Sequence, residues 1–336
     1  GVGLDLNMLK RLRMTFDFYQ KRTSNLLFAV PISGVIGVTS IWQNIGELTN
    51  TGFETTLSAD IIKNKDLTWT FDANLSTNTN KIKKLYSGRD QIIEGDGIAG
   101  STNTLLRPGL SADTYYLREW AGVDPDTGAP QWLTTDANGD RVITKNYAKA
   151  DQVALDKRAT PNVFGSFSTT LMYKGFDLNA VFGYSLGAYI YNYSRQEYDS
   201  DGAYTDRNQF SLQKGWKRWK QKGDIATHPV AAYNNPSNAN KASTRYLESA
   251  DFLKLRSVTL GYNFNLKSQF VKALRVYVSG ENLFCITDYS GVDPELPAAD
   301  GGRDASGERS TALSISTGAG VYPSVRKFML GVNVTF

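Results

Sequence analysis

The segment LTWTFDANLS, residues 67–76, alternates between two kinds of side chain. Leu67, Trp69, Phe71, Ala73 and Leu75 are apolar, whereas the residues between them are Thr, Thr, Asp, Asn and Ser. A period of two places these sets on opposite faces of a β-strand, and a helix would mix them. The segment therefore predicts a strand with one apolar and one polar face.

The same alternation recurs along the chain. It is found at residues 12–19, 53–60, 176–185, 258–264, 274–280 and 328–336. The composition agrees, since 30 Gly, 18 Tyr and 16 Phe stand against one His, one Cys and four Met. Such a mixture favours strands and turns over helices, so we predict an all-β fold.

Hydropathy and charge exclude two classes of protein. The hydrophobic content is 41%, the mean hydropathy is −0.35, and no run of about 18 apolar residues predicts a transmembrane helix. A transmembrane β-barrel stays possible, because alternating strands average to a polar composition. The formal net charge of +4 is spread along the chain and is too weak to indicate nucleic-acid binding.

The connections between the predicted strands are of two sizes. Short ones lie near residue 9, after residue 60, at residue 174 and after residue 264. Long ones run from about Lys21 to Asn50, Thr77 to Ser111, Asp136 to Pro161, Tyr191 to Asp251 and Ile286 to Val325. The two sizes alternate if AGVDPDTGAPQW, residues 121–132, is a further tight hairpin. Short turns at one end and long, solvated loops at the other are typical of outer-membrane barrels.

Two all-β architectures fit this pattern. A β-sandwich also alternates, since it buries one face and exposes the other. Strands of about ten residues have the reach of a tilted membrane strand. Aromatic residues near the strand ends, such as Tyr19, Trp69, Tyr173 and Tyr262, match the girdles of a membrane barrel. We therefore favour a transmembrane antiparallel β-barrel.

Catalysis is not expected, so we predict that the protein is not an enzyme. His228 and Cys285 are the single histidine and cysteine of the chain, which leaves no clustered zinc ligands. His228 lies in a polar loop segment, and we predict a solvated residue there rather than a catalytic base. No glycine-rich phosphate-binding motif occurs between a strand and a helix.

One loop resembles a calcium site. Asp136, Asn138 and Asp140 match positions 1, 3 and 5 of a calcium-binding loop. Arg141 replaces the glycine of the sixth position, and Tyr147 replaces the bidentate glutamate of the twelfth. A bound Ca²⁺ ion is therefore one interpretation, and an ordinary Asx-rich turn is the favoured one.

Aromatic residues gather among charged residues in the long connection after residue 191. Flat rings beside Arg, Asp and Asn suit sugar recognition, because a pyranose stacks on a ring while its hydroxyls bind polar groups. The candidate substrate-binding residues are Tyr198, Tyr204, Trp216 and Trp219. The favoured alternative places Trp216 and Trp219 on one face of a short loop helix packed on the barrel rim. Contact with a partner protein is the third interpretation.

Residues 249–336 resemble the C-terminal end of the SusC-like (RagA-like) TonB-dependent transporters of the Bacteroidetes outer membrane. The matching pieces are FLKLRSVTLGY at 252–262, ENLF at 281–284, then Tyr289, Gly291, Asp293 and Pro294, and Tyr322-Pro323 before a last strand that ends in Phe. Upstream, NIGELTNTGFETTLSAD is similar to a family stretch, through Asn44, Gly46, Asn50, Gly52 and Glu54. The resemblance runs in order along nearly the whole chain.

The resemblance implies a fold and a location. Residues 1–336 would form the C-terminal part of a barrel of about 22 strands, and would supply about the last eleven. The plug domain and the TonB box would lie outside this chain, and its open edges would pair with the remaining barrel strands. The C-terminus would be periplasmic, and the apolar residues would meet outer-membrane lipid. Phe336 resembles the terminal aromatic that outer-membrane assembly machinery recognises.

The resemblance also implies a function. Family members import nutrients, most often oligosaccharides and alternatively peptides, with energy from TonB–ExbB–ExbD acting through the plug. A SusD-like surface lipoprotein would dock on the long extracellular loops. The alternative outside this family is a surface β-sandwich that binds carbohydrate without transporting it.

Overall fold

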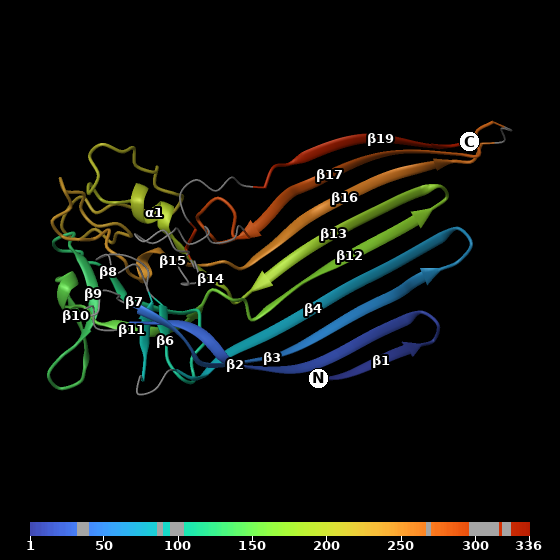
Figure 1. Ribbon diagram of the computed structural model, residues 1–336. Helices are drawn as coiled ribbons and strands as arrows, with labels where there is room; N and C mark the ends of the chain where they lie inside the picture. Colours follow the sequence, from blue (N-terminus) through green and yellow to red (C-terminus); the bar gives the residue numbers. More distant parts are fainter. Residues whose placement is uncertain (32–39, 86–89, 95–103, 267–269, 296–315, 318–323) are drawn as a thin grey trace.

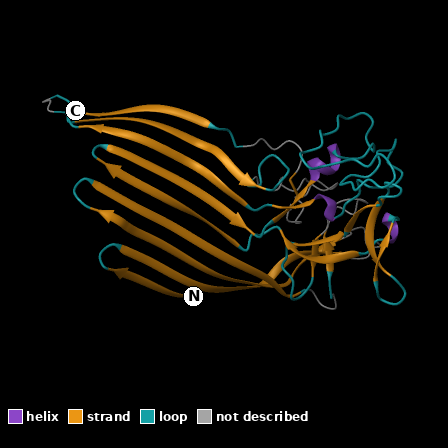
Figure 2. Cartoon of the chain, turned by 180° about the vertical axis from the view of Figure 1, so that it is seen from behind, coloured by secondary structure: helices purple, strands orange, loops and turns teal. Residues whose placement is uncertain are grey.

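The computed structural model describes residues 1–31, 40–85, 90–94, 104–266, 270–295, 316–317 and 324–336. The chain forms a wide antiparallel sheet with a layer of loops and small sheets at one end (Figures 1 and 2). Within these ranges, no helix is long and apolar enough to cross a membrane. The helical elements among the described residues are α1 (Tyr193–Tyr198) and the 3₁₀ turns at Tyr147–Lys149 and Thr244–Tyr246.

Nine strands make up the large sheet, and each pairs with its neighbour antiparallel. In sheet order they are β1 (Val2–Met8), β2 (Leu12–Pro31), β3 (Ser40–Lys63), β4 (Leu67–Lys84), β12 (Val163–Tyr173), β13 (Phe176–Leu186), β16 (Phe252–Phe264), β17 (Ala273–Thr287) and β19 (Lys327–Thr335). The order follows the sequence. Short turns therefore lie at the end of the sheet near the C-terminus, and long connections lie at the other end (Figure 1).

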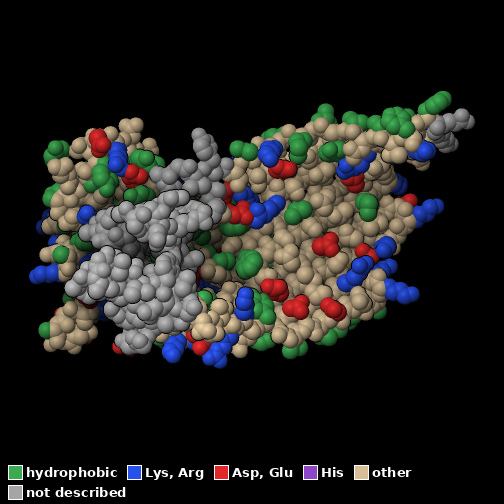
Figure 3. Space-filling view, viewed as in Figure 1, with side chains coloured by type: hydrophobic (Ala, Val, Ile, Leu, Met, Phe, Trp, Pro, Cys, Tyr) green, Lys and Arg blue, Asp and Glu red, His purple; other side chains and the backbone are tan. Residues whose placement is uncertain are grey.

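The pairing register sorts the side chains by polarity. Ala73 pairs with Phe167, and Phe167 pairs with Phe182, so the apolar set of each strand continues across the next. The rings of Phe167 and Phe182 stack with centroids 4.8 Å apart. The opposite face carries the polar set, where Asn74 Nδ2 donates to Ser166 Oγ at 2.6 Å. Figure 3 shows acidic and basic side chains scattered over the strands, with few hydrophobic ones among them.

The apolar face of the sheet is uncovered in the described part of the chain. Phe176, Leu260, Val278 and Leu330 keep 53%, 47%, 50% and 74% of their surface exposed. A sandwich would bury these side chains against a second sheet, so the sandwich alternative is wrong. β12 and β13 are 11 residues long, the reach of a tilted transmembrane strand. The predicted class, a transmembrane antiparallel barrel, is confirmed.

Tyrosine rings cover glycines on neighbouring strands of the polar face. A Cβ on Gly52 would lie 2.4 Å from the Tyr19 ring, and one on Gly331 would lie 2.2 Å from the Tyr277 ring. Both positions therefore need a residue without a side chain. This packing explains the glycine in the TNTGFE segment, and it favours one register over its neighbours.

Two expectations about the strands and their connections need correction. Nine strands, rather than about eleven, form the described sheet, because the hairpin at 121–132 joins a separate small sheet in the loop layer. Most of the expected loop at 21–50 is strand, since β2 and β3 stay paired as far as Pro31 and Ser40. Alternation and turn chemistry do not reveal which sheet a hairpin joins. Tyr322-Pro323 and most of the last long connection lie outside the described residues.

The polarity of the faces predicts the outcome of a pair of arginine substitutions. Val278→Arg puts a charge among Leu260 and Leu330 on the apolar face, and we expect it to destabilise the barrel by about 2–4 kcal/mol. Its neighbour Ser279 faces the polar side, so Ser279→Arg is the matched control. The measurement is the fraction of protein that reaches the outer membrane and migrates in the folded, heat-modifiable form. Equal folding of the two variants would contradict the assignment of the faces.

Candidate functional site

The loop layer is a packed structure with its own sheets. One sheet contains β5 (Ile92–Glu94), β6 (Thr104–Leu106), β7 (Thr114–Arg118) and β11 (Gln152–Arg158), a second contains β8 (Trp120–Val123), β9 (Pro130–Thr135) and β10 (Arg141–Thr144), and a third contains β14 (Tyr189–Asn192), β15 (Leu247–Ser249) and β18 (Ser316–Thr317). Tyr115, Tyr191 and Tyr246 are fully buried in a shared core. The expectation of merely solvated loops is therefore wrong for these segments.

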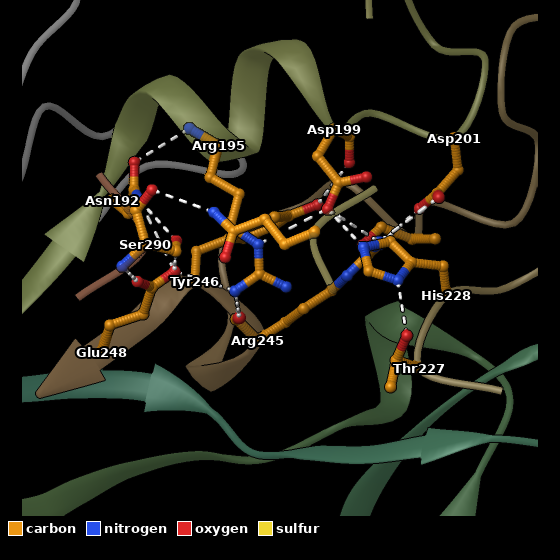
Figure 4. Close-up of polar contacts among 12 residues, drawn as sticks. Asn192, Arg195, Asp199, Asp201, Thr227, His228, Arg245, Tyr246, Glu248 and Ser290 are labelled. Atoms are coloured by element: carbon orange, nitrogen blue, oxygen red, sulfur yellow. Dashed lines mark hydrogen bonds and ion pairs between the residues drawn. The ribbon is translucent and has the colours of Figure 1, made fainter. Parts of the chain in front are cut away.

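Ionisable side chains lie together inside this layer, and Figure 4 labels five of the six that we consider. We call Arg195, Asp199, Asp201, Arg218, His228 and Arg245 the buried ionic cluster. Asp199 and Asp201 keep 3% and 0% of their surface exposed. Asp201 Oδ1 accepts from Arg218 Nη1 at 2.5 Å, and its other oxygen binds Arg245. These contacts join segments that lie 17 and 44 residues apart in sequence.

His228 belongs to the same cluster and is fully buried. Its Nε2 lies 2.7 Å from Asp199 Oδ2, and its Nδ1 lies 2.8 Å from Thr227 Oγ1. The prediction of a solvated histidine is therefore wrong. The polar composition of the loop suggested solvent, but the carboxylate that buries this ring lies 29 residues away in sequence.

The electrostatics of the cluster keep Asp199 ionised. Burial by itself would raise the pKa of Asp199, but the hydrogen bond from His228 and the charges of Arg245 and Arg195 hold that pKa below its ordinary value. Burial raises the pKa of the Tyr246 phenol, which lies beneath the cluster. Each charge has partners inside the protein, so the arrangement is suited to holding loops together.

Arg195 extends the cluster towards the last long connection. Its Nη1 donates to Glu248 Oε1 at 2.9 Å, and Glu248 accepts from the backbone N–H of Ser290 at 2.8 Å (Figure 4). The guanidinium also lies 4.3 Å from the centroid of the Trp216 ring. The cluster therefore joins the connection between β13 and β16 to the chain that follows β17.

The two predicted tryptophan candidates, Trp216 and Trp219, make different contacts. Trp216 lies between Arg195 and His228, whose ring centroid is 5.0 Å from its own. Trp219 Nε1 donates to the Pro125 carbonyl at 2.9 Å, and its ring covers Gly128. The backbone at 216–219 is not the expected helix, and Arg218 forms an isolated β-bridge with His228 there.

The two tyrosine candidates differ in exposure. Tyr198 is half-buried, and its ring centroid lies 5.3 Å from that of Phe210. Tyr204 is 37% exposed, and the Arg207 guanidinium lies 4.6 Å from its ring. Tyr204 thus offers the more accessible ring. Contact of either residue with a substrate stays a prediction.

The calcium candidates form the turn between β9 and β10. Asp136 Oδ1 accepts from the backbone N–H groups of Asn138 and Asp140, both at 2.9 Å. Gly139, at a φ of +88°, completes this Asx turn. Among the residues described, no group of three or more His, Cys, Asp or Glu side chains is arranged to hold a metal ion. Calcium binding by this loop stays a prediction.

A buried lysine anchors the motif that follows β17. Lys254, on the polar face of β16, is 3% exposed, and its Nζ lies 3.0 Å from Asp293 and 3.1 Å from Glu295. Tyr289 covers Gly291, where a Cβ would lie 2.3 Å from the ring. Asp293 therefore holds the loop against the barrel wall, and Gly291 makes room for the Tyr289 ring. Phe336, the last residue, is 76% exposed, and its role in assembly stays a prediction.

The fold and these loop anchors define a class of protein, a segment of a transmembrane β-barrel with structured loops at one end. Comparison with known proteins shows what the chain is similar to. A search against protein-family models found no match. The whole chain is 31% identical to 33% of TonB-dependent receptor P3 of Formosa agariphila. It is 28% identical, again over its full length, to 31% of TonB-dependent receptor SusC of Bacteroides thetaiotaomicron.

A solved structure of the RagAB peptide transporter has the same fold. The similarity covers 99% of this chain and 34% of the matched chain, with a TM-score of 0.78 and 27% identity. The predicted resemblance to SusC-like (RagA-like) TonB-dependent transporters is therefore confirmed. The chain spans about a third of the length of the curated relatives it matches. These relatives are receptors and transporters rather than enzymes.

Removal of one charge tests whether the buried ionic cluster holds the loop layer. Asp199→Asn leaves Arg245, Arg195 and Arg218 short of a buried carboxylate, and we expect a loss of about 3–5 kcal/mol in local stability. The measurement is the rate of protease cleavage within residues 187–251. Asp206→Asn, on an exposed residue of the same connection, is the control. Equal cleavage rates for the two variants would show that the cluster does not hold the loops.

The lowered pKa of Asp199 also predicts a pH dependence. An ionised Asp199 stabilises the folded loops above the ordinary pKa of 3.8, and its contribution is lost as the pH falls through the lowered value. We expect the environment of Trp216 to be unchanged down to about pH 5 and to change below about pH 4. Intrinsic fluorescence, compared with the Trp216→Phe variant, reports this change. A transition already complete at about pH 6 would contradict the prediction.

Proposed function

We propose that this chain forms part of an outer-membrane TonB-dependent importer, with its long connections outside the cell and its C-terminus in the periplasm. The observation that carries the proposal is the nine-stranded sheet with one uncovered apolar face and one polar face. Lipid suits the first face, and a water-filled lumen or a plug suits the second. The placement of short turns and long loops at opposite ends supports the orientation.

The proposed importer needs parts beyond these residues. The outer edges of β1 and β19 have no partner within the described sheet, and unpaired backbone groups in lipid are destabilising by several kcal/mol each. We propose that they pair with the remaining barrel strands, around an N-terminal plug that TonB–ExbB–ExbD energises. A SusD-like lipoprotein would dock on the loop layer. Similarity to SusC and to the RagAB transporter supports this arrangement.

Oligosaccharides are the proposed substrate class. The polar face presents amide and hydroxyl groups, such as those of Asn74, Ser166 and Asn179, which suit the many hydroxyls of a glycan. The exposed ring of Tyr204 beside Arg207 suits a pyranose at the entrance. Peptide import is the second candidate, because the similarity to the RagAB peptide transporter is as high as that to SusC.

Uptake by cells that carry the full-length protein tests the proposal. We expect fluorescently labelled oligosaccharides to accumulate in energised cells, and accumulation to be lost when the gene is deleted or the proton-motive force is collapsed. A labelled peptide mixture is tested in parallel. Uptake of peptides alone would replace the glycan assignment, and energy-independent uptake of either probe would contradict TonB-dependent import.

Substitution of Tyr204 tests whether its ring binds oligosaccharide at the proposed entrance. Tyr204→Ala removes a stacking surface and is expected to weaken oligosaccharide binding about two- to tenfold without loss of folded protein. Tyr193, an exposed tyrosine of α1 outside the candidate set, gives the control Tyr193→Ala. Affinity is measured by isothermal titration of the full-length protein in detergent. An unchanged affinity would remove Tyr204 from the binding surface.

A further inference from the structure

A cavity of about 530 Å³ lies beyond the end of strand β12, beside the part of the neighbouring strand β4 that extends further. The last pair between these strands joins Val163 to Thr77, and β4 continues to Lys84. Part of the free edge of β4 is paired by the loop layer, since the Ile82 N–H donates to the Leu110 carbonyl at 2.9 Å. The cavity occupies the space that remains, between β4, β11 and the start of β14.

The cavity has an excess of positive charge. Lys81, Arg107, Lys157 and Arg158 line it, against the single carboxylate of Asp156, so four cations minus one anion leave a charge of +3. In the part of the chain that the structure describes, these four cations form no ion pair with a carboxylate. Such an arrangement favours an anionic ligand.

Two of the cations have neutral partners. Arg158 donates to the Asn162 side chain and, at 3.4 Å, to the Asn78 carbonyl. Lys157 Nζ lies 4.8 Å from the centroid of the Tyr189 ring. Arg107 and Lys81, which also line the cavity, are exposed. The first two cations are therefore held in place, while the other two are free to close on a ligand.

The cavity lies at the upper limit of the apolar face. Leu186 pairs with Val163, and both belong to the apolar set, whereas Asn162 and Gly187, the next residues, line the cavity. The regular register of β4 through Thr79 and Lys81 puts these two side chains on the same side as the apolar set. In the proposed membrane orientation, lipid headgroups lie at this height.

We infer that this cavity binds the phosphate groups of an outer-leaflet lipid headgroup. Guanidinium and ammonium groups are the preferred partners of phosphate in proteins, and a phosphorylated lipid would neutralise the excess charge of the cavity. The acyl chains of that lipid would lie on the apolar face below Leu186 and Val163. The inference rests on the proposed outer-membrane location, and it assigns a lipid site distinct from the import path.

Binding of diphosphoryl lipid A to the full-length protein in detergent tests this inference. The triple variant Lys81→Gln, Arg107→Gln and Lys157→Gln keeps a polar side chain at each position but removes three charges. We expect it to bind at least tenfold more weakly than the wild type. Lys83→Gln, on an exposed lysine of β4 outside the cavity, should bind like the wild type. Affinity is measured by native mass spectrometry and by thermophoresis.

Two results would overturn the inference. Equal affinity of the triple variant and the wild type would show that the cavity is not the binding site. Equally tight binding of inorganic phosphate alone would assign the cavity to a free anion rather than to a lipid. Outer-membrane fractionation and oligosaccharide uptake are measured in the same strains, so failure of the lipid site is distinguishable from failure of the proposed import function.

Discussion

Backbone hydrogen bonding in one continuous register is the constraint on which the rest of the structure depends. A shift of one residue between two strands would turn every apolar side chain of one strand to the polar face. The pairing of Val278 with Leu260 and with Leu330 shows that the register holds across three strands of the apolar face. Tyrosine rings over Gly52 and Gly331 add local packing that favours this register. The uncovered apolar face then follows, and with it the membrane location.

The loop layer is held by a different kind of interaction. The strands there are short, with two to seven residues each, and the hydrophobic core is small. Buried ion pairs also hold the loops together. Asp199 and Asp201 each bind side chains from more than one segment, and each buried carboxylate would be destabilising without these partners. A second link, between Lys254 and Asp293, attaches this layer to the barrel wall. These charged groups are shielded from water, so each one needs all of its partners inside the protein. The loops that supply the partners therefore become ordered together rather than one at a time.

The sequence was sufficient to predict that the wall consists of alternating strands, but not the full length of β2 and β3 or the structure of the loop layer. In a membrane wall, successive residues of a strand face lipid and the barrel interior in turn. The alternation at residues 67–76 reflects these two environments directly. The hairpin at 121–132 carries an equally clear turn signal, yet it belongs to the loop layer, because pairing partners are set by tertiary contacts. His228 is the clearest case. Its neighbours in sequence are polar, and the carboxylate that accounts for its burial lies 29 residues away. A single sequence contains no signal for such a pair.

Unequal strand lengths connect the wall to the loop layer. β3 and β4 have 24 and 18 residues, whereas β12 and β13 have 11 each, so the longer strands project beyond the apolar face. A projecting strand has unpaired backbone groups along its free edge, which the rest of the protein must satisfy. The Ile82 N–H and carbonyl bind the backbone of residues 109–110, and the Asn78 carbonyl accepts from Arg158. An arginine that satisfies a strand edge brings its charge to the boundary of the apolar face. The basic cavity at this boundary is therefore a consequence of how the sheet ends.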